Sequence, residues 1–431
     1  MHPLSRRGPI AVLAGLALVG AAACSSGGDQ PVAAGVTTTE APTTSAGEST
    51  TTTAAPTPTW PLTGIETADP AAGRPAVAVK LDNHPDARPH TGINDADLVY
   101  ELKVEGITRL AAIFHSTDAN PVGPIRSARS SDINLLANLA RPLLLWSGGN
   151  PGVTDMVTRA ASVNGLVDVS HSVGNAHYFR GSDRAAPHNL YANMSDIRAE
   201  FTPGDATPPV ALFTYRKAGE ASSGDATPGV TIDFGNNVLV DYVWDPARSC
   251  FARYQVDYNH PRGSSAFVDS TGTQACPANV VVMNIEYGIS SADANSPEAV
   301  TVGQGDGLVL SDGKAVPIRW KRDLPISVPT ITDAAGNPVG LTPGKTWVAL
   351  PEAADAPIHP MDAGTAQSLL AGVEAGADRR VGAPGRRFRL RVWRGAPGWA
   401  TCLRRLTPPS PVPRPERCSS SAVWRRCSPA A

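Results

Sequence analysis

The stretch DADLVYELKVEGITRLAAIFH, residues 95–115, predicts the centre of the fold. Apolar and polar side chains alternate over residues 98–105, and this period of two is typical of a β-strand. Glu101 and Glu105 fall on the same face of that strand. Gly106 then provides a turn, after which the stretch returns as a second strand. The stretch therefore indicates a β-hairpin whose first strand carries two carboxylates on one face.

Strand and helix patterns surround this hairpin on both sides. Upstream, RPAVAVKLDN (residues 74–83) shows the alternation of another strand. Downstream come a helical pattern rich in capping serines, a short apolar strand, a second helix and a further strand. These segments are ARSSDINLLANLA (128–140), PLLLW (142–146), PGVTDMVTRAAS (151–162) and GLVDVS (165–170). This order predicts an α/β fold, with a layered α/β N-terminal domain over residues 61–205.

The second half of the chain consists of short β-type runs separated by turn signals, namely ALFTY, GVTIDF, NVLVDYVWD, CFARYQVDY, NVVVMNIEYG, GLVLSDGKAVPIRWKR and TWVALP. Asp312-Gly313 is a strong hairpin turn. These runs predict a smaller β-rich C-terminal domain over residues 206–354. Cys250 and Cys276 are candidates for a disulfide in an oxidising compartment, and the alternative is two separate buried thiols.

The N-terminus predicts export and lipidation. Arg6 and Arg7 precede an apolar run that is too short to span a bilayer, so residues 1–23 have the form of a signal peptide. The run ends in AAAC and resembles the bacterial lipoprotein box, which implies cleavage before Cys24, lipid on its thiol and an acyl chain such as palmitate on its new amine. The alternative is an ordinary signal peptide with a chance cysteine. The Thr-, Ala- and Pro-rich residues 24–60 predict a disordered linker that tethers the body to the outer face of the cell membrane.

Residues 355–431 are expected to form a low-order tail rich in arginine and proline. From residue 379 onward the chain has 13 arginines and a single acidic residue, Glu416, so this part carries a charge of +12 and everything before it −14. The body is therefore acidic, and no nucleic-acid binding is expected. Such a composition is typical of a GC-rich coding region that is read out of frame, so the tail is not expected to be part of the evolved fold. The alternative is a genuine basic arm that contacts anionic lipid or wall polymer.

The candidate ligand-binding site is a set of ten polar residues in the predicted N-terminal domain. They combine arginines, carboxylates, histidines and amides, which are groups that bind anions or exchange protons. The candidates are Asp82, Asn83, His84, Glu101, Glu105, Arg109, Arg126, Arg129, His188 and Asn189.

Two of these candidates, Arg126 and Arg129, stand in GPIRSARSSD (residues 123–132) at the predicted first turn of a helix, where the helix dipole disfavours positive charge. In one interpretation each arginine pairs with Glu101 or Glu105. In the other, the guanidinium groups and the free helix N–H groups receive a carboxylate or phosphate. The abundance of nearby carboxylates favours pairing.

No recognised catalytic or metal-binding motif accompanies these residues. The spacing of the Asp82-Asn83-His84 and His188-Asn189 groups fits no close-packed ligand set, so neither a metal nor another cofactor is expected. Ser147 precedes a glycine pair but lacks the earlier glycine that a nucleophile elbow requires. The segment GQGDG (303–307) lacks the Lys-Ser/Thr of a phosphate-binding loop.

Several motifs in one order resemble the YerB-like lipoprotein family, which consists of the N- and C-terminal domains of unknown function DUF3048. They are KLDNHPDARPHTGINDADLVYELKVEGITRLAAIFH, GPIRSARSSD, YFRGSDRAAPHNLY and GQGDGLVLSDGKAVPIRWKR with PGKTWVALP, and together they cover residues 74–351. The resemblance implies an envelope location and a two-part architecture. It implies no activity.

The functional expectation is a lipid-anchored extracytoplasmic protein that binds an anionic cell-wall or lipid-linked ligand, or a protein partner, in an accessory or scaffold role. This expectation rests on clustered charge without a recognisable nucleophile or metal motif. The alternative is an envelope-acting hydrolase or transferase in which Glu101 or Glu105 and His84 or His188 act as acid–base groups.

Overall fold

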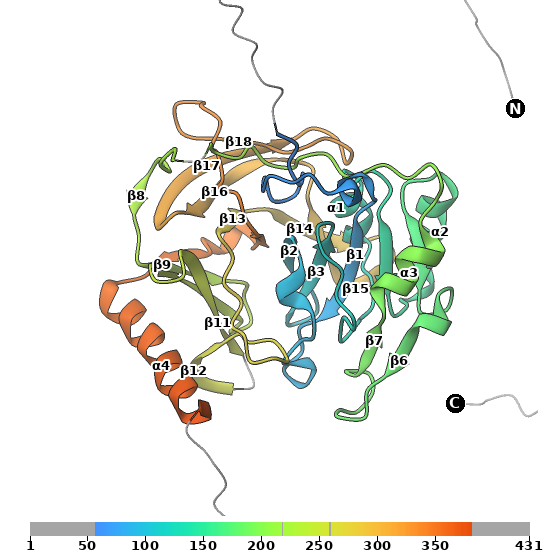
Figure 1. Ribbon diagram of the computed structural model, residues 1–431, viewed down its shortest axis with the longest axis horizontal. Coiled ribbons are helices and arrows are strands. Elements are labelled where there is room, and N and C mark those ends of the chain that lie inside the picture. The colour runs from blue at the N-terminus through green and yellow to red at the C-terminus, as the bar shows by residue number, and fades with distance from the viewer. Residues whose placement is uncertain (1–56, 218, 258–259, 382–431) are drawn as a thin grey trace, which may run out of the picture. The chain divides into compact units, whose positions relative to one another are not determined.

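The computed structural model describes residues 57–381 except residues 218, 258 and 259 (Figure 1). The predicted signal peptide, Cys24, most of the linker and the arginine-rich end of the tail lie outside the described residues. No helix among the described residues is both long enough and apolar enough to cross a membrane.

The centre of the described chain is a mixed sheet of 11 strands. In spatial order its strands are β18 (Thr330–Thr332), β17 (Lys314–Arg322), β16 (Gly303–Ser311), β13 (Asn279–Met283), β19 (Thr346–Leu350), β2 (Leu98–Lys103), β3 (Thr108–Phe114), β1 (Val77–Asp82), β4 (Leu143–Trp146) and β5 (Val167–Ser170), while β8 (Asp225–Ala226) pairs with β17.

Strands from both halves of the sequence meet inside this sheet. Strand β19 runs parallel to β2, and Thr346 lies opposite Leu98. The segments 61–205 and 206–354, which the sequence predicts as two domains, therefore share one sheet. The fold is β-rich and mixed, and the layered α/β arrangement is present only in part, where β1, β4 and β5 lie parallel and α2 connects β4 to β5.

The predicted hairpin is confirmed as the antiparallel pair β2–β3, with Gly106 at a φ of 73° in the turn. Strand β1 lies between β3 and β4 and is buried along its whole length, so its polar residues also need partners inside the protein. Lys80 satisfies this need because its Nζ lies 2.6 Å from Asp132 Oδ1, with both side chains fully buried. The sequence pattern revealed the apolar alternation of β1 but not this internal ion pair.

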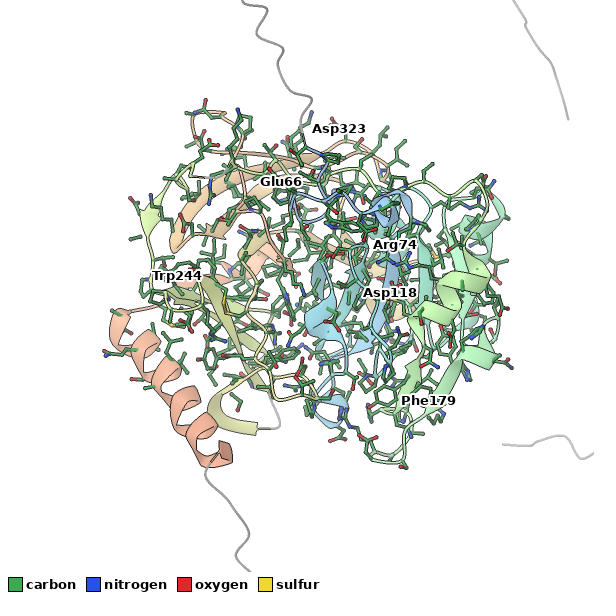
Figure 2. All side chains as sticks on the ribbon, in the orientation of Figure 1. Glu66, Arg74, Asp118, Phe179, Trp244 and Asp323 are labelled. Atoms are coloured by element: carbon green, nitrogen blue, oxygen red, sulfur yellow. A yellow bond between two sulfur atoms is a disulfide. The ribbon has the colours of Figure 1, made fainter. Side chains whose placement is uncertain are left out.

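Four helices belong to the described residues: α1 (Ser131–Leu136), α2 (Pro151–Ser162), α3 (Met194–Phe201) and α4 (Ala363–Val381). Leucines of α1 and valines of α2 belong to the core on one face of the main sheet, while Met194 and Ile197 of α3 belong to the core on the other face. Asp118, after β3, lies 3.2 Å from Arg74 (Figure 2). It also lies 2.8 Å from Arg198 of α3, which ties this helix to the sheet.

A second sheet covers the core on the α3 face. Its order is β12 (His260–Ala266), β11 (Cys250–Asp257), β10 (Leu239–Asp245), β9 (Gly229–Asp233) and β20 (Ile358–Pro360). Ile232 and Tyr242 of this sheet pack into the same cluster as Val79 and Leu110 of the main sheet. The predicted disulfide is present, and the Cα atoms of Cys250 and Cys276 are 5.3 Å apart. Two small hairpins complete the fold: β6 (Tyr178–Arg180) with β7 (Leu190–Ala192), and β14 (Glu286–Ser290) with β15 (Asp293–Val300).

Two predictions in this half need correction. The low-order tail is expected from residue 355, but β20 pairs with β9, and α4 follows beside the second sheet (Figure 1). Ala366, Leu369 and Leu370 of α4 pack against residues of β10 and β11. The segment ALFTY (211–215) is predicted as a strand, but the structure gives it only one isolated β-bridge, between Tyr215 and Leu341. The other predicted runs contain strands, and Asp312-Gly313 forms its turn with positive φ at both residues.

Candidate functional site

A pocket of about 460 Å³ lies where β1 and β4 end. The carboxyl ends of parallel strands are where open α/β sheets bind ligands. Polar side chains from four parts of the chain contribute to the walls. The lining residues are Arg126, Ser127, Ala128, Arg129, Ser147, Gly148, Gly149, Asn150, Val153, Arg180, Pro187, Leu190, Asp293 and Ser296.

The segment that carries the two predicted arginines is clamped between the strand ends. The Arg126 amide donates to the Lys80 carbonyl at 2.8 Å, and the Ser147 amide donates to the Arg126 carbonyl at 3.0 Å. Helix α1 begins at Ser131, so both arginines precede it, and the prediction that they occupy its first turn is wrong. Main-chain bonding to β1 and β4 holds Arg126 in an extended segment instead.

The amino-terminal end of helix α2 forms another wall of the pocket. Ser147, Gly148 and Gly149 lead from β4 to Asn150, whose side chain caps the helix by accepting the Val153 amide at 2.8 Å. Partial positive charge at such a helix end favours a nearby anion. The helix end and the arginines therefore both contribute positive electrostatic potential to the pocket.

Arg129 is largely engaged by a carboxylate, as one interpretation of the sequence required. Its Nε and Nη2 donate to the two carboxylate oxygens of Glu105 at 2.9 and 2.6 Å. Desolvation alone would raise the pKa of Glu105, but the hydrogen bonds from Arg129 and Ser296 and the Arg129 charge lower this pKa to about 2. Glu105 is therefore ionised at neutral pH.

The Arg129–Glu105 pair gives a testable pH dependence. The folded-state pKa of Glu105 lies below its ordinary value of 4.5, so the stabilisation is present above pH 4.5 and disappears as the pH falls toward 2. Glu105→Gln should lower the free energy of unfolding by no more than about 1 kcal/mol at pH 7, because the pair is partly exposed. Urea unfolding of both proteins at pH 7, 4 and 3 checks this. A difference that stays constant across that range would contradict it.

Arg126 is held much more loosely than Arg129. Its Nε lies 3.3 Å from Asp82 Oδ2 without a well-aligned hydrogen bond, and 30% of its side chain is exposed. Asp82 Oδ2 is shared with His188 Nδ1, which lies at 2.8 Å. Within residues 57–381, the two terminal nitrogens of Arg126 have no protein partner, so their N–H groups remain available to a ligand in the pocket.

Two further arginines add positive charge around the pocket. Arg180, from β6, donates through Nη1 to Asn189 Oδ1 at 2.9 Å and is otherwise exposed. Arg109 lies beneath, almost fully buried, and donates to the Ser127 carbonyl at 3.0 Å. Desolvation and the neighbouring charge of Arg129 lower the pKa of Arg109 to about 10, which leaves it charged at neutral pH. The pocket lining itself carries three arginines and one carboxylate, Asp293.

Glu101 and Asn83 lie away from the pocket. Glu101 accepts from Arg253 Nη2 at 2.9 Å and from Thr108 Oγ1 at 2.8 Å, and its side chain is fully buried. Asn83 donates to Thr108 Oγ1 at 2.7 Å in the same network. The expectation that Glu101 pairs with Arg126 or Arg129 is therefore wrong, because Arg253 from the second sheet occupies its carboxylate.

The remaining candidates lie beside the pocket. His84 and His188 stack with their ring centroids 4.5 Å apart, and Asp82 holds His188. Asn189 donates to the carbonyls of Gly181 and Arg184, so its amide mainly orders the loop before β7.

Several lining residues were not predicted. Arg180 stands in YFRGSDR (178–184), four residues before Arg184. This clustering of arginines in the sequence is a signal that could have indicated an anion-binding role. Asp293 and Ser296 come from β15, far along the chain, and no local pattern connects them with Arg126.

Comparisons with known proteins place this fold in a family. Residues 62–207 match the family described as Protein of unknown function (DUF3048) N-terminal domain, and residues 230–348 match its C-terminal domain. The chain is 31% identical over 299 residues to the Putative lipoprotein YerB of Bacillus subtilis (strain 168), which covers 67% of this chain and 84% of that protein.

A solved structure agrees at the level of the fold. The crystal structure of YerB protein from Bacillus subtilis matches with a TM-score of 0.56 and 24% sequence identity, over 69% of this chain and 97% of that one. The resemblance expected from the sequence motifs is thereby confirmed. The chain belongs to the YerB-like family of proteins described as DUF3048.

Proposed function

We propose that this protein is a lipid-anchored, extracytoplasmic receptor that binds an anionic component of the cell envelope in the arginine pocket. The observation that carries the proposal is the pair of open guanidinium groups, Arg126 and Arg180, facing one pocket beside the α2 terminus. Arg129 is neutralised by Glu105, whereas Arg126 pairs with Asp82, a carboxylate that His188 also contacts. The pocket thus keeps unused donors of positive charge.

The chemistry of the lining favours a phosphate group over a carboxylate alone. Guanidinium forks match phosphate oxygens in pairs, and a helix amino terminus is a common phosphate site. Hydroxyl groups of Ser127, Ser147 and Ser296 also line the pocket and suit a hydroxylated or glycosylated neighbour of that phosphate. A volume of about 460 Å³ lies within the range of small-molecule sites, so a phosphorylated headgroup or sugar unit fits.

Membrane anchoring is part of the same proposal. The sequence places Cys24 after a signal-peptide-like run, and a relative of this chain bears the description putative lipoprotein. A lipid on Cys24 followed by the Thr- and Pro-rich linker would hold the pocket near envelope material.

The competing enzymatic role has less support from the geometry. Glu101 is fully buried, and both of its oxygens accept from Arg253. Glu105 has a pKa of about 2 and so is a poor proton donor at neutral pH. Of the four predicted acid–base groups, only His84 and His188 are partly exposed without being held by an arginine.

A titration calorimetry panel tests the proposal with the full chain in detergent. Inorganic pyrophosphate, glycerol phosphate and a muramyl dipeptide supply phosphate or carboxylate groups, and N-acetylglucosamine is the neutral control. We expect the phosphate probes to bind, the neutral sugar not to bind, and affinity to fall as salt increases. Failure of every anionic probe to bind, or equal binding of the neutral sugar, would refute the proposal.

A further inference from the structure

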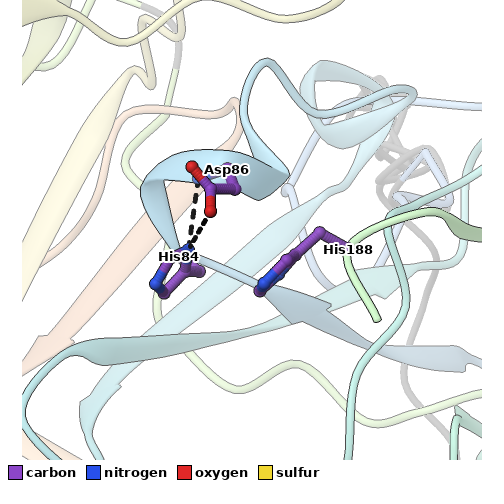
Figure 3. A group of neighbouring side chains, drawn as sticks. All are labelled: His84, Asp86 and His188. Carbon is purple, nitrogen blue, oxygen red and sulfur yellow. Dashed lines mark hydrogen bonds and ion pairs between the residues drawn. The ribbon is translucent and has the colours of Figure 1, made fainter. Parts of the chain in front are cut away.

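Three potential metal ligands meet just outside the arginine pocket. One ligand atom from each of His84, Asp86 and His188 lies within 4.8 Å of the other two. Figure 3 shows the two imidazole rings side by side, with the Asp86 carboxylate next to His84. His84 and Asp86 belong to the short turn η2 (Pro85–Ala87) and its cap, whereas His188 belongs to the loop before β7. Two separate loops therefore contribute to one cluster.

Hydrogen bonds hold these two loops against each other. Arg184, in the loop of His188, donates to the Pro89 carbonyl at 2.9 Å and also to the Ala87 carbonyl. Asp82 accepts from the His84 amide at 3.2 Å and from His188 Nδ1 at 2.8 Å. The approach of His84 to His188 is thus fixed by contacts that involve no ligand.

The hydrogen bond to Asp82 prepares His188 for metal binding. A metal-bound histidine usually donates its other ring nitrogen to a carboxylate, which sets the tautomer and orients the ring. Asp82 is almost completely buried and supplies this carboxylate, so His188 Nε2 is the nitrogen left for a metal. Among the described residues, Nε2 has no protein partner.

The separation between His84 and Asp86 suits two ligands of a tetrahedral ion, and the His188 ring would rotate out of its stack with His84 to join them. His84 Nδ1 and Asp86 Oδ2 are 3.6 Å apart, close to the separation of about 3.4 Å between two ligands of tetrahedral zinc with bonds near 2.1 Å. The lone pair of His84 Nδ1 now accepts only a 3.2 Å bond from the Asp86 amide, which a metal would replace. The Asp86 side chain is 73% exposed and free to move toward the rings.

We propose that His84, Asp86 and His188 form a binding site for Zn²⁺ or a similar divalent transition-metal ion. Two imidazoles and one carboxylate are the donor set that such ions select, whereas Ca²⁺ and Mg²⁺ prefer oxygen ligands. Three protein ligands leave a fourth position open, as in sites that bind an exogenous ligand. This inference does not depend on the anion receptor, because its residues and its test are separate.

The experiment uses the full chain without a histidine tag, stripped of metal with EDTA. Zn²⁺ binding is measured by titration calorimetry, and Co²⁺ is added separately because four-coordinate Co²⁺ absorbs visible light strongly. We expect one tight site and a four-coordinate Co²⁺ spectrum. His84→Gln/His188→Gln should weaken binding at least about 100-fold, since loss of an outer partner alone costs about 10- to 100-fold.

The matched control is His171→Gln/His177→Gln, which removes two histidines of the same region that lie outside the cluster. It should keep wild-type affinity and the same Co²⁺ spectrum. Asp86→Asn, at an exposed position, should fold normally and lose at least about tenfold in affinity. Absence of a tight site in the wild-type protein, or equal losses in the cluster and control variants, would overturn the proposal.

Discussion

Replacing Arg253 with methionine is expected to lower the free energy of unfolding by about 3–5 kcal/mol, because the fully buried carboxylate of Glu101 loses the arginine that pairs with it. Arg253 Nη2 lies 2.9 Å from both oxygens of Glu101, and neither side chain is exposed. The guanidinium also lies 4.0 Å from the Phe267 ring and 4.8 Å from the Trp347 ring, which adds a cation–π contribution. This pair joins the second sheet to β2, so its loss weakens the contact between the two sheets.

Urea unfolding at pH 7 measures the effect, with Arg319→Met as the matched control. Arg319 pairs with Asp306 at 3.6 Å, but 76% of the Arg319 side chain is exposed, so this change should cost less than about 1 kcal/mol. The double variant Glu101→Leu/Arg253→Met should recover part of the loss, because it removes the unpaired charge. Equal losses for Arg253→Met and Arg319→Met would show that the buried pair does not stabilise the fold as described.

Local signals in the sequence are enough to predict the β2–β3 and β16–β17 hairpins, but not β6–β7 or β14–β15. Alternation followed by Gly106 gave β2 and β3, and Asp312-Gly313 gave the β16–β17 turn, because these pairings depend on neighbouring residues. The parallel pairing of β2 with β19 joins residues far apart in the sequence. No local pattern encodes such a pairing, so the sharing of one sheet by both halves was not foreseen.

The sequence predicts which kinds of residue gather near the candidate site better than it predicts how those residues pair. Asp82 and Asn83 are adjacent in sequence, but Asp82 turns toward the pocket and Asn83 toward the buried Glu101 network. The partner of Glu101 was missed because Arg253 belongs to the other half of the chain. The helical pattern after Arg129 predicts that Arg126 lies in the first turn of a helix, whereas main-chain bonds to Lys80 of β1 and to Ser147 after β4 hold it outside that helix. The side-chain directions of Asp82 and Asn83, the partner of Glu101 and the backbone conformation at Arg126 all depend on tertiary contacts.

The second large effect is expected at the arginine pocket. Arg126→Gln/Arg180→Gln should weaken phosphate binding by roughly 10²- to 10⁴-fold, since one charge-assisted hydrogen bond contributes about 1.5–3 kcal/mol. Unfolding should change little, because Asp82 keeps its bonds from His188 and the His84 amide when Arg126 is lost. The double variant should therefore lose affinity for phosphate while keeping a free energy of unfolding close to that of the wild-type protein.

A surface double variant controls for the change in net charge. Arg159→Gln/Arg319→Gln removes the same two charges from exposed positions on α2 and β17, neither of which lines the pocket. Its affinity for a phosphate probe should stay within about threefold of the wild-type value at 0.15 M salt, because distant surface charges are screened. A loss in the pocket variant alone assigns binding to the pocket.

We propose that the open guanidinium groups of Arg126 and Arg180 form an anion receptor. The most direct measurement is the dissociation constant of inorganic pyrophosphate for the full chain, the pocket double variant and the surface double variant under one buffer condition. We expect clear binding by the wild-type protein and the surface variant, and a loss of at least about 100-fold in the pocket variant. Equal dissociation constants for all three folded proteins would contradict it.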